Sequence, residues 1–400
     1  MTARDRSAKL RPRKVQSKRI EITDEIRKAV LAQLDRGVYY GGEQAYRFEQ
    51  ELAAYLGVRH VLTVNSGTSA LLAAAIALGI GPGDEVIVPA NVYVSSAEVP
   101  AFLGAVPVFC DVDEATANMT AETLRARLSS RTKALIVTHM YGHAVDLDPI
   151  LEIVRARGLR VIEICAHGLG AEYKGKKLGA FGDAAVFSLG SKNISMCATG
   201  GAVATNSARL YEEAARVSRH GWGRLSVTPS FYRQIAFADS PMSGMSPLDR
   251  DSARPGLNLQ LDEIPCAIGR IGLRHLEEWN ARRREVAALY TRLLAEAGVP
   301  VHAPVVHPWT KHAFLHYVVR APRRDGLRDF LVETGVEALI HYPQPLPDMR
   351  YYREHYPTSP AVYPVASRLA GEILTLPIHP WLDDADAEYV VARISQFYRD

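Results

Sequence analysis

Residues 65–71 (NSGTSAL) of this 400-residue chain are small and rich in hydroxyls, and they lie where an apolar run leads into a helical pattern. Small residues let the backbone approach a ligand closely, and the free N–H groups at a helix N-terminus attract anions. The hydroxyls of Ser66 and Thr68 would strengthen such a site. The run therefore predicts a phosphate site, with an ordinary helix cap as the alternative. It is not a Walker loop, because no Gly-Lys-Ser/Thr follows.

Three more candidates follow predicted strands. Tyr93 could stack on a planar ring, although a lone aromatic residue is more often packing. In IEICAHG (162–168), Glu163 and Ile164 cannot serve the same site, because successive strand residues face opposite sides of a sheet. His167 follows in the same segment. Lys192, in FSLGSKNI (187–194), could form a Schiff base, with a surface lysine as the alternative.

The elements that must position these residues are short apolar runs that alternate with helical patterns. Such runs occur at 61–64, 86–88, 106–109, 134–137 and 160–162. Near-continuous apolar strands separated by helices predict an α/β fold with a mostly parallel sheet covered on both faces. Two further runs, 184–188 and 201–205, resemble a hairpin. Helices are also predicted from about residue 22 to 34 and over 43–56.

The length exceeds what one hydrophobic core usually holds, which predicts two domains. A long charged helix at 264–297 changes the pattern, and the mixed strands and helices after it are typical of a smaller α+β unit. We therefore expect a large cofactor-binding domain at 21–265 and a small C-terminal domain at 266–400. The segment 221–258 is unusually long for a loop, and such loops often contact a ligand or another subunit.

The net charge of +3 comes from the N-terminus, where eight of the 47 lysines and arginines lie within the first 19 residues. Only one of the 44 acidic residues, Asp5, lies there, so the rest of the chain is slightly acidic. This charge distribution gives no support for nucleic-acid binding by the body of the protein. We expect residues 1–20 to form a basic, disordered arm that solubilises the chain, with binding to an acidic surface as the alternative.

The composition also argues against other classes. With 48% hydrophobic and 23% charged residues, the chain is neither fibrous nor disordered. Its longest apolar stretches are too short to span a bilayer, which takes about 20 residues. The four cysteines have no zinc-type spacing, and the histidines form no metal-binding pair, so we expect no metal. Because no secretory signal is apparent, we expect a cytoplasmic location.

In their order and spacing, these segments resemble the DegT/DnrJ/EryC1/StrS family. The matching motifs run from about residue 22 to 397 and include SGTSAL, PANVY, VIEICAH, FSLGSKN, YKG, GAFGD, RHG, GLN and HYP. The resemblance implies the aspartate-aminotransferase architecture (fold type I) and a homodimer. It also implies pyridoxal 5′-phosphate as cofactor and a keto sugar or keto cyclitol as substrate, with glutamate or glutamine as amino donor, in amino-sugar, secondary-metabolite or antibiotic biosynthesis.

The resemblance also implies roles for single residues. The cofactor phosphate would be held by the 66–68 segment (Ser66, Gly67 and Thr68) together with Ser188. Tyr93 would stack on the pyridine ring, and His167 would lie near the ring hydroxyl. Lys192 would be the Schiff-base amine. Asn258 would reach the phosphate of the partner subunit's site, so that each active site is shared.

Two positions depart from the family pattern. Ile164 stands where the family has an aspartate that keeps the pyridine nitrogen protonated, which makes the ring an electron sink. Counted from Phe187, Lys192 also arrives one residue early, and Asn193 occupies the strict position of the lysine. Either the loop has slid and Lys192 still reaches the cofactor, or the Schiff-base lysine has been lost.

We therefore carry three hypotheses. The first is a divergent aminotransferase, with slow transamination or with epimerisation or dehydration, which depend less on the electron sink. The second is an enzyme that has lost the cofactor and uses His167, His220 or Glu163 as acid or base. The third is a non-catalytic partner that supports an active homologue through a dimer interface.

Overall fold

The computed structural model of the chain describes residues 13–39, 41–190, 199–222, 252 and 254–400. Its centre is a seven-stranded sheet in the order β1-β9-β8-β5-β4-β2-β3. These strands are β1 (His60–Val64), β2 (Glu85–Pro89), β3 (Val106–Cys110), β4 (Thr132–Thr138), β5 (Arg160–Ile164), β8 (Ala184–Ser188) and β9 (Gly201–Thr205). Only β9 is antiparallel to its neighbours, which confirms the mostly parallel sheet and the predicted β8–β9 hairpin pairing.

Helices cover the sheet on both faces, as predicted. In β4, Leu135 and Val137 join a core with α2 and α6, whereas Ala134 and Ile136 join a second core with α3, α4 and α7. Burial on both faces explains why these strands are almost wholly apolar. The helices of this part are α1 (Asp24–Arg36), α2 (Glu43–Leu56), α3 (Gly67–Ala77), α4 (Ser95–Phe102), α5 (Ala121–Arg125), α6 (Leu147–Arg157) and α7 (Ala208–Ser218).

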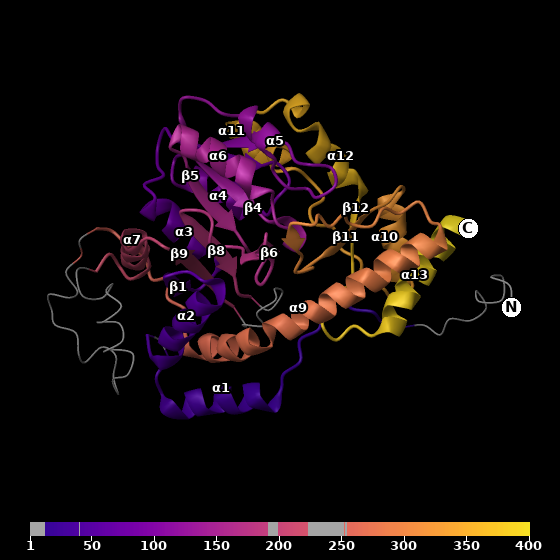
Figure 1. Cartoon of the computed structure of the whole chain (residues 1–400), viewed down its shortest axis with the longest axis horizontal. Coiled ribbons are helices and arrows are strands. Elements are labelled where there is room, and N and C mark those ends of the chain that lie inside the picture. The colour runs from indigo at the N-terminus through magenta and orange to yellow at the C-terminus, as the bar shows by residue number, and fades with distance from the viewer. Residues whose placement is uncertain (1–12, 40, 191–198, 223–251, 253) are drawn as a thin grey trace.

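The long helix α9 (Glu263–Ala297) runs from beneath the sheet to the C-terminal elements (Figure 1). Its first half packs against α1 and α2, and it also packs against α13 (Asp384–Arg399). The remaining elements are α10 (Arg324–Glu333), α11 (Arg350–His355), α12 (Pro364–Glu372), β6 (Glu172–Tyr173), β7 (Lys176–Lys177), β10 (Thr310–Lys311), β11 (Tyr317–Arg320) and β12 (Ile373–Leu376). A third core joins α9, α10, α13, β11 and β12.

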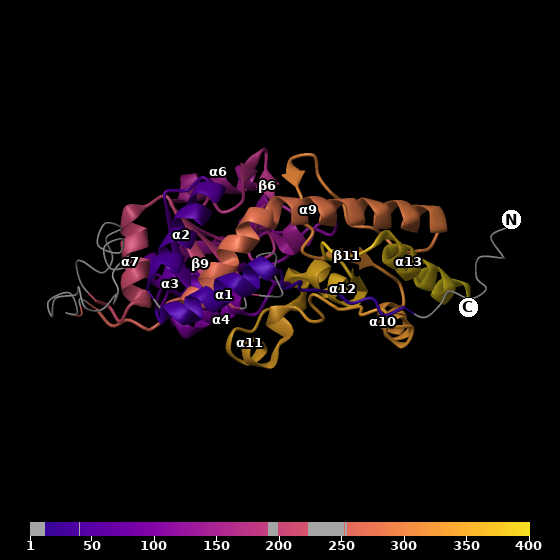
Figure 2. The ribbon, with the colours of Figure 1, turned by 90° about the horizontal axis from the view of Figure 1, so that it is seen from below.

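Not all of the C-terminal part belongs to that third core. Leu346, Tyr352 and Tyr363, near α11 and α12, pack into the core on the α3 side of the sheet. In the view from below, α11 and α12 lie between the sheet region and α10 (Figure 2). The division at residue 265/266 stays a prediction. No helix among the described residues is long and apolar enough to cross a membrane.

For residues 13–20 the structure differs from the disordered arm that composition predicted. Val15 is 1% exposed and forms a parallel bridge with Val336, and Arg13 forms salt bridges with Asp383 and Asp386. The physical reason is that one apolar residue within the basic run finds a buried site and a free backbone to pair with. Residues 1–12 lie outside the described part of the chain.

Candidate active site at the carboxyl ends of the strands

A cavity of about 800 Å³ opens where the carboxyl ends of the parallel strands meet the C-terminal elements. Six of the predicted site residues line it: Ser66, Gly67, Thr68, Tyr93, His167 and Ser188. They come from the ends of β1, β2, β5 and β8, which are far apart in the sequence. Parallel strands place such ends at one edge of the sheet, which is where ligands bind in open α/β folds.

The turn between β1 and α3 has the geometry of an anion site. Ser66 is the N-cap of α3, and its Oγ accepts a hydrogen bond of 3.0 Å from the N–H of Ser69. Among the described residues, nothing accepts from the N–H groups of Gly67 and Thr68, which lie in the first helical turn and remain available to an anion. A Cβ on Gly67 would lie 3.1 Å from the Cβ of Ser188, so any larger residue in this turn would force β8 or the helix end to shift.

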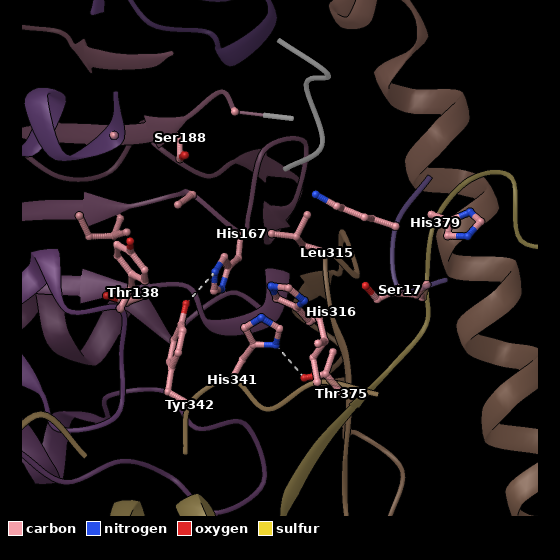
Figure 3. A pocket seen from close by; sticks show the side chains of 18 of the residues that line it. Ser17, Thr138, His167, Ser188, Leu315, His316, His341, Tyr342, Thr375 and His379 are labelled. Atoms are coloured by element: carbon pink, nitrogen blue, oxygen red, sulfur yellow. Dashed lines mark hydrogen bonds between the residues drawn. The ribbon is translucent and has the colours of Figure 1, made fainter. Parts of the chain in front are cut away.

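His167 is held by its neighbours in one orientation (Figure 3). Its Nδ1 accepts a hydrogen bond of 3.2 Å from the N–H of Tyr141, and its Nε2 lies 3.5 Å from the hydroxyl of Tyr342. We therefore assign the proton of the neutral ring to Nε2. Burial, and then the charge of His341, lowers the pKa of His167 to about 3. His167 is thus a neutral hydrogen-bond donor at physiological pH.

Sequence reasoning assigned no role to the aromatic residues that surround His167. The rings of His167 and His316 lie 4.9 Å apart, and those of His316 and His341 lie 4.1 Å apart. Tyr342 lies 6.0 Å from Tyr93, measured between ring centroids. The HYP motif at 341–343 was the only signal for part of this cluster. No sequence motif indicated His316, because only the folding of the C-terminal part brings this residue to the cavity.

Ile164 and Glu163 face opposite sides of the sheet, as predicted. Ile164 lines the cavity beside Thr138, its partner on β4. The Thr138 hydroxyl is buried and has no hydrogen-bond partner within the described chain. Glu163 is fully buried on the other face, where it lies 3.2 Å from His139 and accepts from the N–H groups of Gly179, Phe181 and Gly182.

Those contacts make Glu163 a structural residue. His139, Glu163 and Cys165 have ligand atoms within 4.8 Å of one another. Nevertheless, the Nδ1 of His139 accepts from the N–H of Val145, and Glu163 already accepts several hydrogen bonds. The hydrogen bonds of this buried cluster are made within the protein, and they join β4 and β5 to the 179–182 turn.

The other four predicted residues are Lys192, Asn193, Asn258 and His220. Lys192 and Asn193 lie outside the described residues, so the choice between them stays open. Asn258 does not line this cavity: it is exposed and bridges Arg219 through the backbone, and its predicted role concerns a partner subunit. His220 is also exposed and outside the cavity, so it is not placed to act there as acid or base.

The cavity fits pyridoxal 5′-phosphate at two of three points. The free N–H groups of Gly67 and Thr68, beside Ser188, suit a phosphate. Tyr93, whose ring is largely exposed in the cavity wall, suits a flat ring. At the third point, Ile164 provides no carboxylate for a ring nitrogen, and the unpartnered hydroxyl of Thr138 is the polar group beside it.

Comparisons with known proteins agree with this geometry. Residues 20–395 match the model of the DegT/DnrJ/EryC1/StrS aminotransferase family. The chain is 34% identical over 382 residues to the erythromycin biosynthesis sensory transduction protein EryC1 of Saccharopolyspora erythraea, covering 95% of this chain and 97% of that one. It is also 34% identical over 379 residues to dTDP-3-amino-3,4,6-trideoxy-alpha-D-glucose transaminase of Streptomyces venezuelae, with 94% and 93% covered.

A solved structure confirms the predicted fold class. The crystal structure of DesV from S. venezuelae superposes with a TM-score of 0.85 at 34% identity, and 95% of each chain is covered. The chain therefore has the fold type I architecture, with a mostly parallel central sheet.

Proposed function

Because this chain belongs to the DegT/DnrJ/EryC1/StrS aminotransferase family, we propose that it transfers an amino group to a keto sugar or keto cyclitol, using pyridoxal 5′-phosphate. The observation that carries this proposal is the gathering of six predicted cofactor residues in one cavity from four separate strand ends. The name of the S. venezuelae relative, a transaminase of a dTDP-linked amino sugar, favours a sugar over a cyclitol.

The residues of the chain would hold the cofactor at its two ends. Gly67 and Thr68 would donate backbone hydrogen bonds to the phosphate, and Ser188 would lie beside it. Tyr93 would cover the ring, and the Nε2–H of His167 would point toward the ring hydroxyl. When bound, pyridoxal 5′-phosphate supplies an electron sink and a carrier for the amino group.

Lys192 is the proposed amine that binds the cofactor and moves the proton between the donor carbon and the cofactor. Its support is the sequence string around it, which resembles the lysine string of the family. We take glutamate or glutamine as the amino donor, a cytoplasmic homodimer with shared sites as the working form, and antibiotic or amino-sugar biosynthesis as the setting.

The apolar Ile164 favours the second hypothesis, an enzyme on this fold that no longer uses the cofactor. Against that hypothesis, Glu163 and His220 lie outside the cavity, and only His167 of its three proposed acids and bases lines it. The low pKa of His167, about 3, also makes it a poor general base near pH 7. The aminotransferase proposal therefore accounts for more of the cavity.

A reduction experiment tests the proposal. The purified protein is incubated with pyridoxal 5′-phosphate, reduced with borohydride and digested, and the modified peptide is identified by mass spectrometry. We expect the cofactor on Lys192, its absence from Lys192→Ala, and unchanged labelling of the matched neighbour variant Asn193→Ala. Labelling of a different lysine would contradict the role of Lys192, and no labelling at all would favour the cofactor-independent enzyme.

A further inference from the structure

The cavity has a second, positively charged wall that the cofactor residues leave unused. Lys18 and Arg19 of the N-terminal arm and Arg283 of α9 line it, and we call these three residues the cationic wall. Glu337 is the one carboxylate among the described lining residues. The three cations and this one carboxylate together give the described lining residues a net formal charge of +2.

Among the three cations, Arg283 points most directly to a bound anion, because its charge is buried without a counter-ion among the described residues. It is 6% exposed, and burial is the only influence on its charge, with no contribution from a carboxylate among the described residues. Its one hydrogen bond runs from Nη1 to Asn280 Oδ1 at 3.3 Å, and its Nε has no partner in the described part. Loss of hydration lowers its pKa to about 9, which leaves it charged near pH 7.

Arg324, a second buried arginine, is compensated. Arg324, 7% exposed, forms a salt bridge of 2.9 Å with Asp325 and donates to the carbonyl of Ile373. Arg219, 5% exposed, lies near Glu49, but burial raises the pKa of that carboxyl to about 7, and the charge of Arg219 only partly offsets this shift. An unpaired buried cation costs folding free energy, so the contrast indicates that the counter-ion of Arg283 is a ligand.

The arm cations are fixed at the cavity by backbone pairing. The N–H of Val15 donates to the carbonyl of Gly335, and the N–H of Glu337 donates back to Val15, both at 2.9 Å. The N–H of Ser17 then donates to Oε2 of Glu337 at 2.8 Å, so this carboxylate is already engaged by the arm. Lys18 and Arg19 follow directly, exposed, with no salt bridge to a described carboxylate.

Two histidines beside this wall, His379 and His316, are neutral near pH 7. Burial, followed by the charges of Arg283 and Arg19, lowers the pKa of His379 to about 4. Burial and the neighbouring His341, His167 and Arg283 hold the pKa of His316 well below its ordinary value. Figure 3 shows Ser17 and His379 across the cavity from Ser188. These histidines therefore add no charge, and the net charge here comes from the three cations and Glu337.

We propose that the cationic wall binds the oxyanion groups of a substrate, opposite the strand ends that hold the cofactor phosphate. Arg283 would be the buried anchor, since a guanidinium can bind carboxylate or phosphate oxygens through two parallel hydrogen bonds. Lys18 and Arg19, which are exposed, would attract further negative charge of the ligand. Two sources share this chemistry, the phosphates of a sugar nucleotide and the carboxylates of the amino donor; the choice between them rests on the proposed function.

The test is calorimetric binding by the full-length protein with pyridoxal 5′-phosphate present, so that the first anion site is filled. The two probes are thymidine diphosphate and glutarate, which has two carboxylates but no amine to react. The wall variants are Arg283→Met and the pair Lys18→Met with Arg19→Met. Lys14→Met removes an exposed arm cation that does not line the cavity, and Arg324→Met removes a buried but paired arginine.

We expect each wall variant to weaken at least one probe by about tenfold or more, the loss of a charged hydrogen bond. Both controls should stay within about twofold of the parent. Loss of thymidine diphosphate binding identifies the sugar nucleotide as the source, and loss of glutarate binding identifies the donor. If Arg283→Met does not fold, the arm pair decides alone, because these side chains are exposed.

Two results would overturn the proposal: wall variants that bind both probes like the parent, or a Lys14→Met variant that loses as much affinity as they do. Failure of the proposed function looks different. In that case borohydride would fix no cofactor to the protein, while probe binding would still depend on the cationic wall.

Discussion

Residue 164 bears most directly on the chemistry, because an isoleucine lines the cavity at the position where the family resemblance predicts a carboxylate. A protonated ring nitrogen beside an apolar side chain would lose hydration without compensation, so the neutral ring is favoured. Thr138, whose buried hydroxyl has no partner among the described residues, is paired with Ile164 on the neighbouring strand. Weak stabilisation of negative charge on the ring follows.

Ile164→Asp should therefore speed the half-reaction with glutamate, by about tenfold or more, because a carboxylate raises the pKa of the ring nitrogen. The unpartnered hydroxyl of Thr138 could donate to the new carboxylate. Stopped-flow absorbance of the cofactor measures the rate. Ile164→Asn is the matched control, since its amide is polar but carries no negative charge to raise the pKa of the ring nitrogen. Equal rates in all three proteins, or a colourless variant that is only less stable, would contradict this account.

Single residues were predicted well where the backbone alone decides their direction. Alternation along a strand was enough to separate Ile164 from Glu163, and the structure confirms it. The roles of His316 and Arg283 were not predictable, because both residues reach the cavity from distant elements. A sequence pattern carries no sign that a cation will be buried without a partner.

At the scale of elements, the turn from β1 into α3 is the feature on which cofactor binding depends. Gly67→Ala would place a Cβ 3.1 Å from Ser188 Cβ and 3.3 Å from its Cα, so the helix end or β8 must shift. We expect the affinity for pyridoxal 5′-phosphate to fall by about tenfold, as measured by fluorescence titration of the apoprotein.

Gly81→Ala is the control for this change, because a Cβ at that position meets no atom within 4 Å. It should bind the cofactor like the parent. If Gly67→Ala also binds with unchanged affinity, the turn does not hold the phosphate.

Local patterns predicted the elements of the sheet, since α2 begins and ends where helical periodicity placed it and each β–α alternation up to β5 is present. The N-terminal arm was predicted wrongly for residues 13–20. Its order comes from pairing with Gly335 and Glu337, some 320 positions away in the chain. Composition describes only the arm itself and contains nothing about such a distant backbone partner.

At the scale of the whole molecule, the exposed position of Asn258 and its absence from the cavity of its own chain are compatible with a site shared between subunits. We expect a homodimer in sedimentation velocity at micromolar concentration. Mixed dimers of Lys192→Ala with Asn258→Ala should contain one site with both native residues, and should therefore regain part of the activity that each variant lacks. A fully active monomer, or no recovery on mixing, would contradict shared sites.

The uneven charge distribution along the chain is related to the position of the N-terminal arm. The body is slightly acidic, while the arm places Lys18 and Arg19 at the mouth of the cavity. The basic N-terminus is thus more than a solubilising extension for the residues that the structure describes, because part of it forms a wall of the candidate active site.

The central claim is that this chain transfers an amino group, and the direct measurement is the chemical form of its cofactor after one encounter with a donor. The protein, loaded with pyridoxal 5′-phosphate, is mixed with excess glutamate or glutamine, denatured, and the released cofactor is separated by chromatography. The account predicts pyridoxamine 5′-phosphate, at most one per subunit, formed slowly by the parent and not at all by Lys192→Ala. Release of unchanged pyridoxal 5′-phosphate with either donor would contradict it.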